Sequence, residues 1–123
     1  MQTLGGCELT VERGPDWLFI RPHGPSLRGH ELDLAEHVWA LLEQNMTHRL
    51  VLEMDDIGVL FSDVVGQLVL LQKRISSQGG LMRLCGVSAN NKRVLETCRL
   101  GGYLPQYADR TQAVMGERPV KPR

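Results

Sequence analysis

The chain has 123 residues, and 42% of them are hydrophobic, which suits one domain with its own core. Lys and Arg total 14, Asp and Glu total 14, and the formal net charge is therefore zero. This balance argues against a general nucleic-acid binder and against attraction to an anionic membrane surface, because both partners require a basic face. No apolar run approaches the roughly 18 to 20 residues that span a bilayer. The first six residues also lack the basic and apolar segments of a signal peptide, so we expect a cytoplasmic protein.

The first half of the chain predicts a hairpin, a helix and a buried strand. Alternating residues on either side of Gly14-Pro15-Asp16 indicate two antiparallel strands. A later segment is apolar throughout its centre, which indicates a strand buried on both faces of a sheet. The predicted elements are strands at residues 7–12 and 17–21, a loop at 22–29, a helix at 31–45, a strand at 48–54 and a loop at 55–58.

The second half alternates helices and strands. Apolar residues at spacings of three and four predict a helix after Phe61, and Gly79-Gly80 ends it. The further predicted elements are a strand at 81–87, a helix at 90–100 capped by Ser88, a short extended segment at 104–107 and a helix at 108–115. This order predicts an α/β domain over residues 5–116. We expect a mixed, mainly parallel sheet of four to five strands with an N-terminal hairpin, about four helices, and a flexible tail at 117–123.

A search for catalytic and metal-binding motifs returns little. The chain contains no P-loop, no GxGxxG after a strand and no GxSxG nucleophile elbow. Its three cysteines are far apart, and we expect them to be buried, reduced thiols. Cys85 lies in an apolar strand, where burial raises the pKa of a thiol and makes it a poor nucleophile. We therefore predict a protein that is not an enzyme and has no catalytic residue, cofactor or metal.

The segment 58–66 is the most informative stretch, because a hydroxyl and a carboxylate stand side by side at a helix start. A helix N-terminus has unpaired N–H groups and a partial positive charge, which favour Ser, Asp or a phosphate. The ordinary interpretation is that Ser62 or Asp63 is the N-cap. The alternative is that this helix start is also a site of contact or modification.

The chain resembles a STAS domain, the fold shared by bacterial anti-sigma factor antagonists and the cytoplasmic tails of sulfate transporters. The most specific parts of the resemblance are residues 50–80 and the segments 84–88 and 92–96 with Leu100. The resemblance covers nearly the whole predicted domain, and the family has the same order of strands and helices.

In phosphorylated members of that family, an Asp-Ser-Ser-Gly or Asp-Ser-Thr-Gly motif precedes the second helix, and its second hydroxyl residue accepts the phosphate. Gly66 and Gly79-Gly80 set the register of this chain against that motif. In that register the motif's four positions fall on Phe61, Ser62, Asp63 and Val64. Asp63 therefore stands at the phosphoacceptor position, where a carboxylate cannot form a stable serine-type phosphoester.

The chain also departs from the family after its second strand. The usual Gly-Glu-Leu-Asp is replaced by Gly24-Pro25-Ser26-Leu27. By the resemblance, Gly24, Ser26 and Leu27 belong to a second partner-binding loop. Ser62 remains a candidate acceptor, although one residue on a helix is a rotation of about 100°.

The resemblance implies a regulatory module that binds an anti-sigma factor or a serine-kinase-like protein and so controls transcription. Asp63 would provide a fixed negative charge in that interface, Ser62 would cap the helix, and Phe61 would supply an apolar contact. The alternative is a non-switching scaffold, or a domain that senses a nucleotide or another small ligand. The sequence identifies neither the partner nor the oligomeric state.

Overall fold

The computed structural model describes residues 2–4, 7–27 and 34–116. The predicted tail at 117–123 and the first residues of the helix predicted at 31–45 lie outside the described residues. The strands are β1 Gln2–Leu4, β2 Cys7–Arg13, β3 Leu18–Leu27, β4 Arg49–Glu53, β5 Ile57–Leu60, β6 Leu81–Cys85 and β7 Gln106–Tyr107. The helices are α1 Leu34–Gln44, α2 Ser62–Ser77, α3 Ala89–Thr97 and α4 Arg110–Met115.

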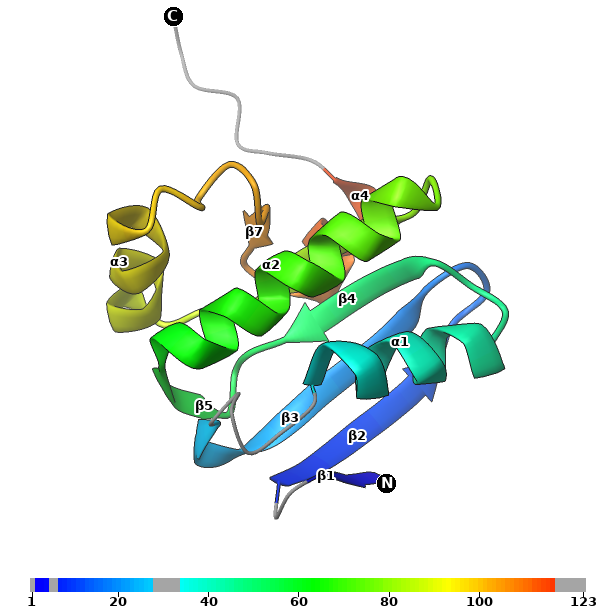
Figure 1. The fold of residues 1–123 in the computed structure, drawn as a ribbon, viewed down its shortest axis with the longest axis horizontal. Helices are drawn as coiled ribbons and strands as arrows, with labels where there is room; N and C mark the ends of the chain where they lie inside the picture. The colour runs from blue at the N-terminus through cyan, green and yellow to red at the C-terminus, as the bar shows by residue number, and fades with distance from the viewer. Residues whose placement is uncertain (1, 5–6, 28–33, 117–123) are drawn as a thin grey trace, which may run out of the picture.

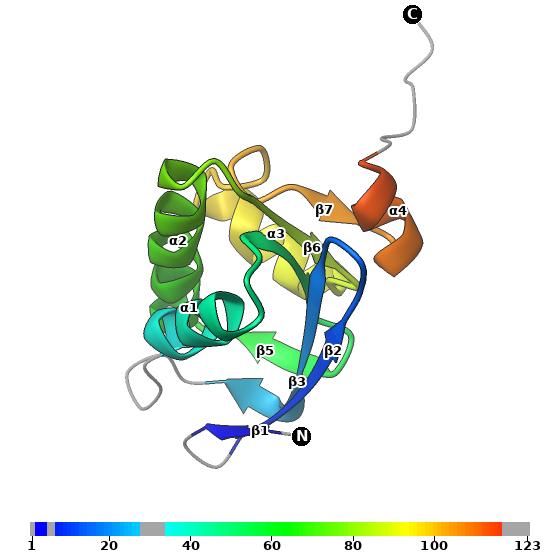
Figure 2. The same ribbon diagram turned by 90° about the vertical axis from the view of Figure 1, so that its right-hand side faces the viewer.

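The strands form one mixed sheet in the order β1-β2-β3-β4-β6-β7, and β5 pairs separately with β3 (Figures 1 and 2). The pairs β1–β2 and β2–β3 are antiparallel, whereas β3–β4, β4–β6, β6–β7 and β3–β5 are parallel. Parallel neighbours require crossover connections, and helices α1, α2 and α3 supply them. The predicted α/β architecture, with a mainly parallel sheet and an N-terminal hairpin, is confirmed.

Helices α1 and α2 cover one face of the sheet, and the short helix α4 covers the other (Figure 2). Side chains of the central strand β4 pack on both faces of the sheet, because successive side chains of a strand point in opposite directions. Leu50 and Leu52 enter the main core beneath α1 and α2. Val51, between them, joins a smaller cluster beneath α4 that also contains Trp17 and Tyr107. The predicted burial of this strand on both faces is confirmed.

The predicted loop at 22–29 is wrong for its described part, since β3 continues through Pro22, Gly24 and Pro25 to Leu27. The predicted loop at 55–58 is also too long, because β5 begins at Ile57. Proline is tolerated where a strand does not need its N–H for pairing. The end of β3 is therefore held by a short partner strand that the sequence pattern did not reveal.

The third predicted helix shows one error of orientation. Ser88 caps α3 as expected, and its side chain accepts a hydrogen bond from the Asn91 N–H. However, Cys98 is exposed rather than buried, while Cys85 is buried as predicted. Cys98 is the C-cap residue that follows α3, and the helix buries Asn91 and Leu95 instead.

Candidate functional site

The two segments that the sequence singled out lie together at one end of the sheet. Gly24 pairs with Ile57, Ser26 with Val59 and Leu27 with Leu60, in parallel register. Helix α2 begins two residues after Leu60. The end of β3, strand β5 and the start of α2 are therefore neighbours at this end of the sheet, and we call this region the β5–α2 site (Figures 1 and 2). Its backbone is defined by residues 24–27 and 57–64.

The start of α2 is built by the backbone of Phe61 rather than by a side-chain cap. Phe61 is the N-cap, with extended φ and ψ of −81° and 155°, and its side chain makes no cap hydrogen bond. Its carbonyl oxygen accepts bonds from the N–H groups of Val64 and Val65, both at 3.0 Å. The prediction that Ser62 caps the helix is therefore wrong, because Ser62 is already its first helical residue.

The Asp63 carboxylate lies at this helix N-terminus. Its Oδ1 accepts a hydrogen bond from the Val64 N–H at 2.9 Å. The side chain of Asp63 is half-buried, and that of the preceding Ser62 is exposed. A negative charge in the first turn is stabilised by the unpaired N–H groups and the helix dipole. The geometry thus supports a carboxylate here whether or not another protein contacts it.

The exposed side of the β5–α2 site combines this charge with apolar surface. Ser62, Gly66 and Leu70 are spaced by four residues, all exposed, and so share one side of α2. Leu70 is 55% exposed, and Val59 on β5 is 48% exposed. Val64, by contrast, is fully buried in the main core. Of the four motif positions, Val64 therefore packs in the core, and the exposed surface of the site comes from neighbouring residues.

Asn91 of α3 also belongs to this region, although sequence reasoning did not select it. The residue is 2% exposed. The amide oxygen accepts from the Leu60 N–H at 3.0 Å, and the amide nitrogen donates to the Ile57 carbonyl at 3.2 Å. The only indication of this role in the sequence is that Asn91 is a polar residue three positions after an N-cap Ser. Such a residue usually points to solvent.

A second polar cluster lies on the sheet face that carries α4. Glu53 is 3% exposed, and its carboxylate receives two bonds from Arg110, at 2.7 and 2.9 Å. The Arg21 Nε lies 3.5 Å from the Glu53 Oε1, and the Arg21 Nη2 lies 3.5 Å from the Asp55 Oδ1. Burial alone would raise the pKa of Glu53, but the hydrogen bonds and charge of Arg110, with the charge of Arg21, outweigh it and lower that pKa. This cluster is a paired structural network that attaches α4 to the sheet.

Cys85 lies next to Glu53 across strands β4 and β6. Burial raises the pKa of its thiol to about 12, and the charges of Glu53 and Asp55 add to that effect. The thiol is therefore protonated at neutral pH, in line with the predicted low reactivity.

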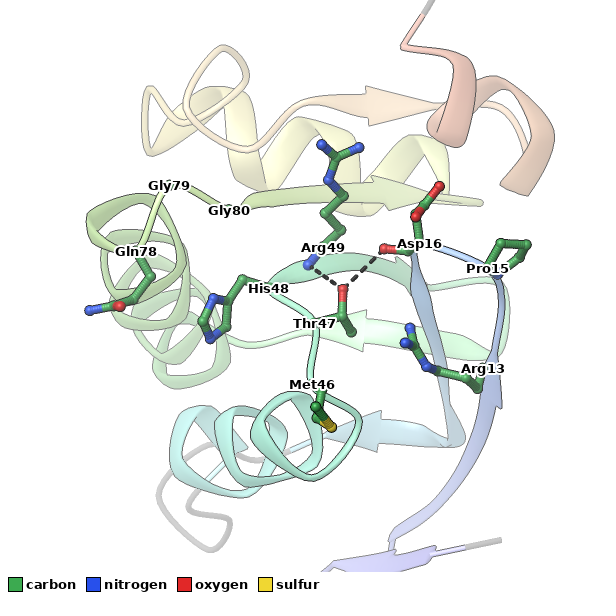
Figure 3. A pocket seen from close by; sticks show the side chains of 10 residues that line it. All are labelled: Arg13, Pro15, Asp16, Met46, Thr47, His48, Arg49, Gln78, Gly79 and Gly80. Carbon is green, nitrogen blue, oxygen red and sulfur yellow. Dashed lines mark hydrogen bonds between the residues drawn. The ribbon is translucent and has the colours of Figure 1, made fainter.

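A hollow of about 400 Å³ lies at the opposite end of the sheet (Figure 3). Arg13, Asp16, Thr47 and Arg49 are among its lining residues. The Thr47 hydroxyl donates to the Asp16 carbonyl at 3.0 Å and accepts from the Arg49 N–H at 3.2 Å. The hollow adjoins the amino end of β4, whereas ligand sites in α/β sheets favour the carboxyl ends of parallel strands, where the β5–α2 site lies.

Among the described residues, no group of three or more His, Cys, Asp and Glu side chains is placed to hold a metal ion. No helix in the described part of the chain combines the length and apolarity needed to cross a membrane.

The fold and this site define a small α/β domain in which helix α2 begins directly after the short strand β5. A model of the STAS domain family matches residues 8–113, and the chain belongs to that family. A comparison with curated protein sequences found no match.

Solved structures show the same fold at low sequence identity. The anti-sigma-factor antagonist (STAS) domain protein from Planctomyces limnophilus has a TM-score of 0.74 and 22% identity, with 88% of this chain and 96% of that chain covered. An anti-sigma factor antagonist from Mycobacterium paratuberculosis has a TM-score of 0.76 and 14% identity, with coverages of 94% and 97%. The Bacillus cell fate determinant SpoIIAA in the phosphorylated form has a TM-score of 0.67 and 17% identity, with coverages of 90% and 100%.

Proposed function

We propose that this STAS domain is a cytoplasmic regulatory module of the anti-sigma factor antagonist type. It binds a kinase-type anti-sigma factor through the β5–α2 site and thereby controls transcription. The observation that carries the proposal is the pairing of residues 24–27 with β5 directly before the start of α2. This pairing brings together two segments that are distant in sequence. The family resemblance assigned both segments to partner binding. The solved structures named as anti-sigma factor antagonists add support through their shared fold.

In this proposal, Asp63 acts as a fixed charge where switching relatives carry a phosphorylated hydroxyl. A carboxylate carries about one negative charge, and a phosphoserine carries about 1.5 to 2. The Asp63 carboxylate already bonds the Val64 N–H, one of the groups that a helix N-terminus offers to an anion. The module therefore stays in one charge state, and its affinity for a partner does not depend on phosphorylation of this position.

The surface around Asp63 also indicates what the partner must provide. Val59 and Leu70 offer exposed apolar side chains, and Ser62 and Gly66 leave the start of α2 sterically accessible. A complementary protein would bring apolar side chains to this surface and a basic or hydrogen-bond-donating group to Asp63.

The test first looks for a kinase-type anti-sigma factor gene beside this one. Its product is then incubated with the protein and ATP, and the protein is followed by intact mass measurement. We expect no added phosphate on the wild type and one phosphate on Asp63→Ser. Because Ser62 is a solvent-exposed first helical residue, Ser62→Ala is included in both backgrounds. A phosphate on the wild type that disappears in Ser62→Ala would contradict the fixed-charge role.

Binding provides the second arm of this test. We expect Asp63→Asn to weaken binding, raising the dissociation constant for the anti-sigma factor about tenfold as measured by calorimetry. Asp109→Asn is the matched control, because Asp109 also accepts a helix N-terminal N–H but belongs to α4 on the other face. Equal effects of the two substitutions, or no binding by the wild type, would overturn the proposal.

A small-ligand function remains the second candidate, and the hollow in Figure 3 is the observation that favours it. Titration of the wild type with a nucleotide, followed by amide chemical shifts, tests it directly. Shifts confined to residues around Arg13 and Arg49 would favour the ligand-sensing alternative over the protein-binding module.

A further inference from the structure

We infer that Asn91 is the positioning residue of the β5–α2 site, an inference that rests on the proposed function for its biological meaning. Asn91 belongs to α3, which is separate in sequence from both segments of the site. Its side chain is almost fully enclosed, and both ends of its amide bond the backbone of β5. Asn91 thus fixes the strand that leads into the start of α2.

The direction of the Asn91 side chain is itself fixed. Its backbone N–H donates to the Ser88 Oγ at 3.2 Å, in the cap that opens α3. The side chain therefore leaves the first turn of α3 toward β5, and α3 contacts β5 in the fold. Asn91 is thus held by two bonds of its buried side-chain amide and one of its backbone N–H, and it transmits the position of α3 to β5.

The two backbone groups that Asn91 contacts are best matched by a side-chain amide. The Leu60 N–H needs an acceptor and the Ile57 carbonyl needs a donor, and a side-chain amide offers both within one planar group. A neighbouring strand would satisfy the same two backbone groups, and Asn91 takes its place. Without these bonds, two buried backbone groups would be left unsatisfied, which is costly.

The consequence for the site follows from the chain connection. Leu60 is bonded to Asn91 and directly precedes Phe61, whose carbonyl accepts the first bonds of α2. On its other side, β5 is held by β3 through the Leu27–Leu60 pair. Loss of the Asn91 bonds would leave β5 held on one side only, and the orientation of Ser62 and Asp63 would become variable.

Hydrogen exchange measured by NMR tests this without any partner. In Asn91→Leu we expect exchange protection of the Leu60 N–H to fall at least tenfold relative to that of Leu52, and the amide resonances of Ser62 and Asp63 to shift. The matched control is Gln72→Leu, because Gln72 is another buried amide but bonds the Tyr103 carbonyl instead. Protection that falls equally at Leu60 and Leu52 in the Asn91 variant, or unchanged Ser62 and Asp63 resonances, would overturn the inference.

A second variant keeps the test decisive if Asn91→Leu does not fold. In Asn91→Asp, an ionised carboxylate can accept from Leu60 but cannot donate to Ile57, whereas the protonated carboxyl group can do both. Burial raises the pKa of a carboxyl group, so we expect the carbonyl ¹³C shift of Ile57, which reports the bond that only the protonated form can donate, to return toward its wild-type value as pH falls from about 7.5 to about 5. An Ile57 carbonyl shift that stays displaced across this range would contradict the hydrogen-bonding role.

Binding separates this inference from the proposed function. With the neighbouring anti-sigma factor, we expect Asn91→Leu to weaken binding at least tenfold while Gln72→Leu leaves it within about twofold. A wild type that does not bind would overturn the proposed function, and the exchange measurements would still decide the role of Asn91 at the helix start. A wild type that binds, with Asn91→Leu binding equally well, would overturn the positioning role.

Discussion

The side chain of Glu53 shows how a single charged residue can be accommodated in a small domain. Its carboxylate is buried, and isolation there would be strongly unfavourable. Two bonds from Arg110 and the nearby Arg21 compensate for the loss of water. The arrangement lowers the pKa of Glu53 relative to an exposed glutamate.

This lowered pKa gives a stability contribution with a defined pH dependence. The contribution is fully present above the unfolded-state pKa of about 4.3 and is lost as pH falls through the lower folded-state pKa. At pH 7 we expect Glu53→Gln to reduce the free energy of unfolding by about 1.5–3 kcal/mol. Chemical denaturation across the pH range should show the wild type losing this advantage in acid.

The control for this prediction is Glu36→Gln. Glu36 also pairs with an arginine, Arg74, but both side chains are exposed, and such pairs contribute about 1 kcal/mol or less. If the two substitutions gave the same loss at pH 7, burial of Glu53 would not be the source of its contribution.

At this scale the sequence was informative where the local pattern decides the outcome. Ser88 was predicted as an N-cap, and its side chain does accept the Asn91 N–H. Asn91 itself could not be selected, because its partners are backbone groups of β5, about thirty residues away in the chain. Ser62 failed as the cap because the backbone of Phe61 already holds the extended cap conformation.

At the scale of elements, helix periodicity was the most reliable signal. The buried face predicted for α2, including Val64, Leu68 and Ile75, is the observed one. Strand β5 was missed because it has only four residues and is stabilised by pairing with β3 rather than by its own pattern. The end of β3 was missed for the same reason, since its Pro and Gly residues are typical of loops. Contacts that are distant in the chain determine both segments.

Helix α4 provides a test of how an element is attached. It has six residues, which is too short for stability in isolation, so tertiary contacts must hold it. Arg110 bonds Glu53 and Glu12, and its guanidinium lies 4.2 Å from the centroid of the Phe19 ring. We expect Arg110→Met to lower the free energy of unfolding by about 2 kcal/mol and to increase hydrogen exchange in α4 more than in α2.

Arg74→Met is the corresponding control, because Arg74 has an ion pair with Glu36 and lies over the Trp39 ring. Its effect should be smaller and confined to the surface between α1 and α2. Equal exchange increases in α2 and α4 after Arg110→Met would contradict a specific attachment of α4.

On the scale of the whole molecule, the sheet separates two apolar clusters of unequal size. The main core lies beneath α1 and α2, and the smaller cluster lies beneath α4. Both clusters depend on the same strand, because Leu50 and Leu52 face one and Val51 faces the other. The shared backbone of β4 couples the two clusters, so we expect them to lose their order together in global unfolding, even where the short helix α4 exchanges locally.

The two tryptophans allow this cooperativity to be measured. Trp39 belongs to the main core and Trp17 to the smaller cluster. In Trp17→Phe and Trp39→Phe, the remaining tryptophan reports on one face of the sheet. For each variant, we expect the urea unfolding transition followed by fluorescence to coincide with that followed by far-ultraviolet circular dichroism, as two-state unfolding requires. An earlier fluorescence transition from Trp17 alone would show that the α4 face opens independently, and the shared strand would then not couple the two clusters.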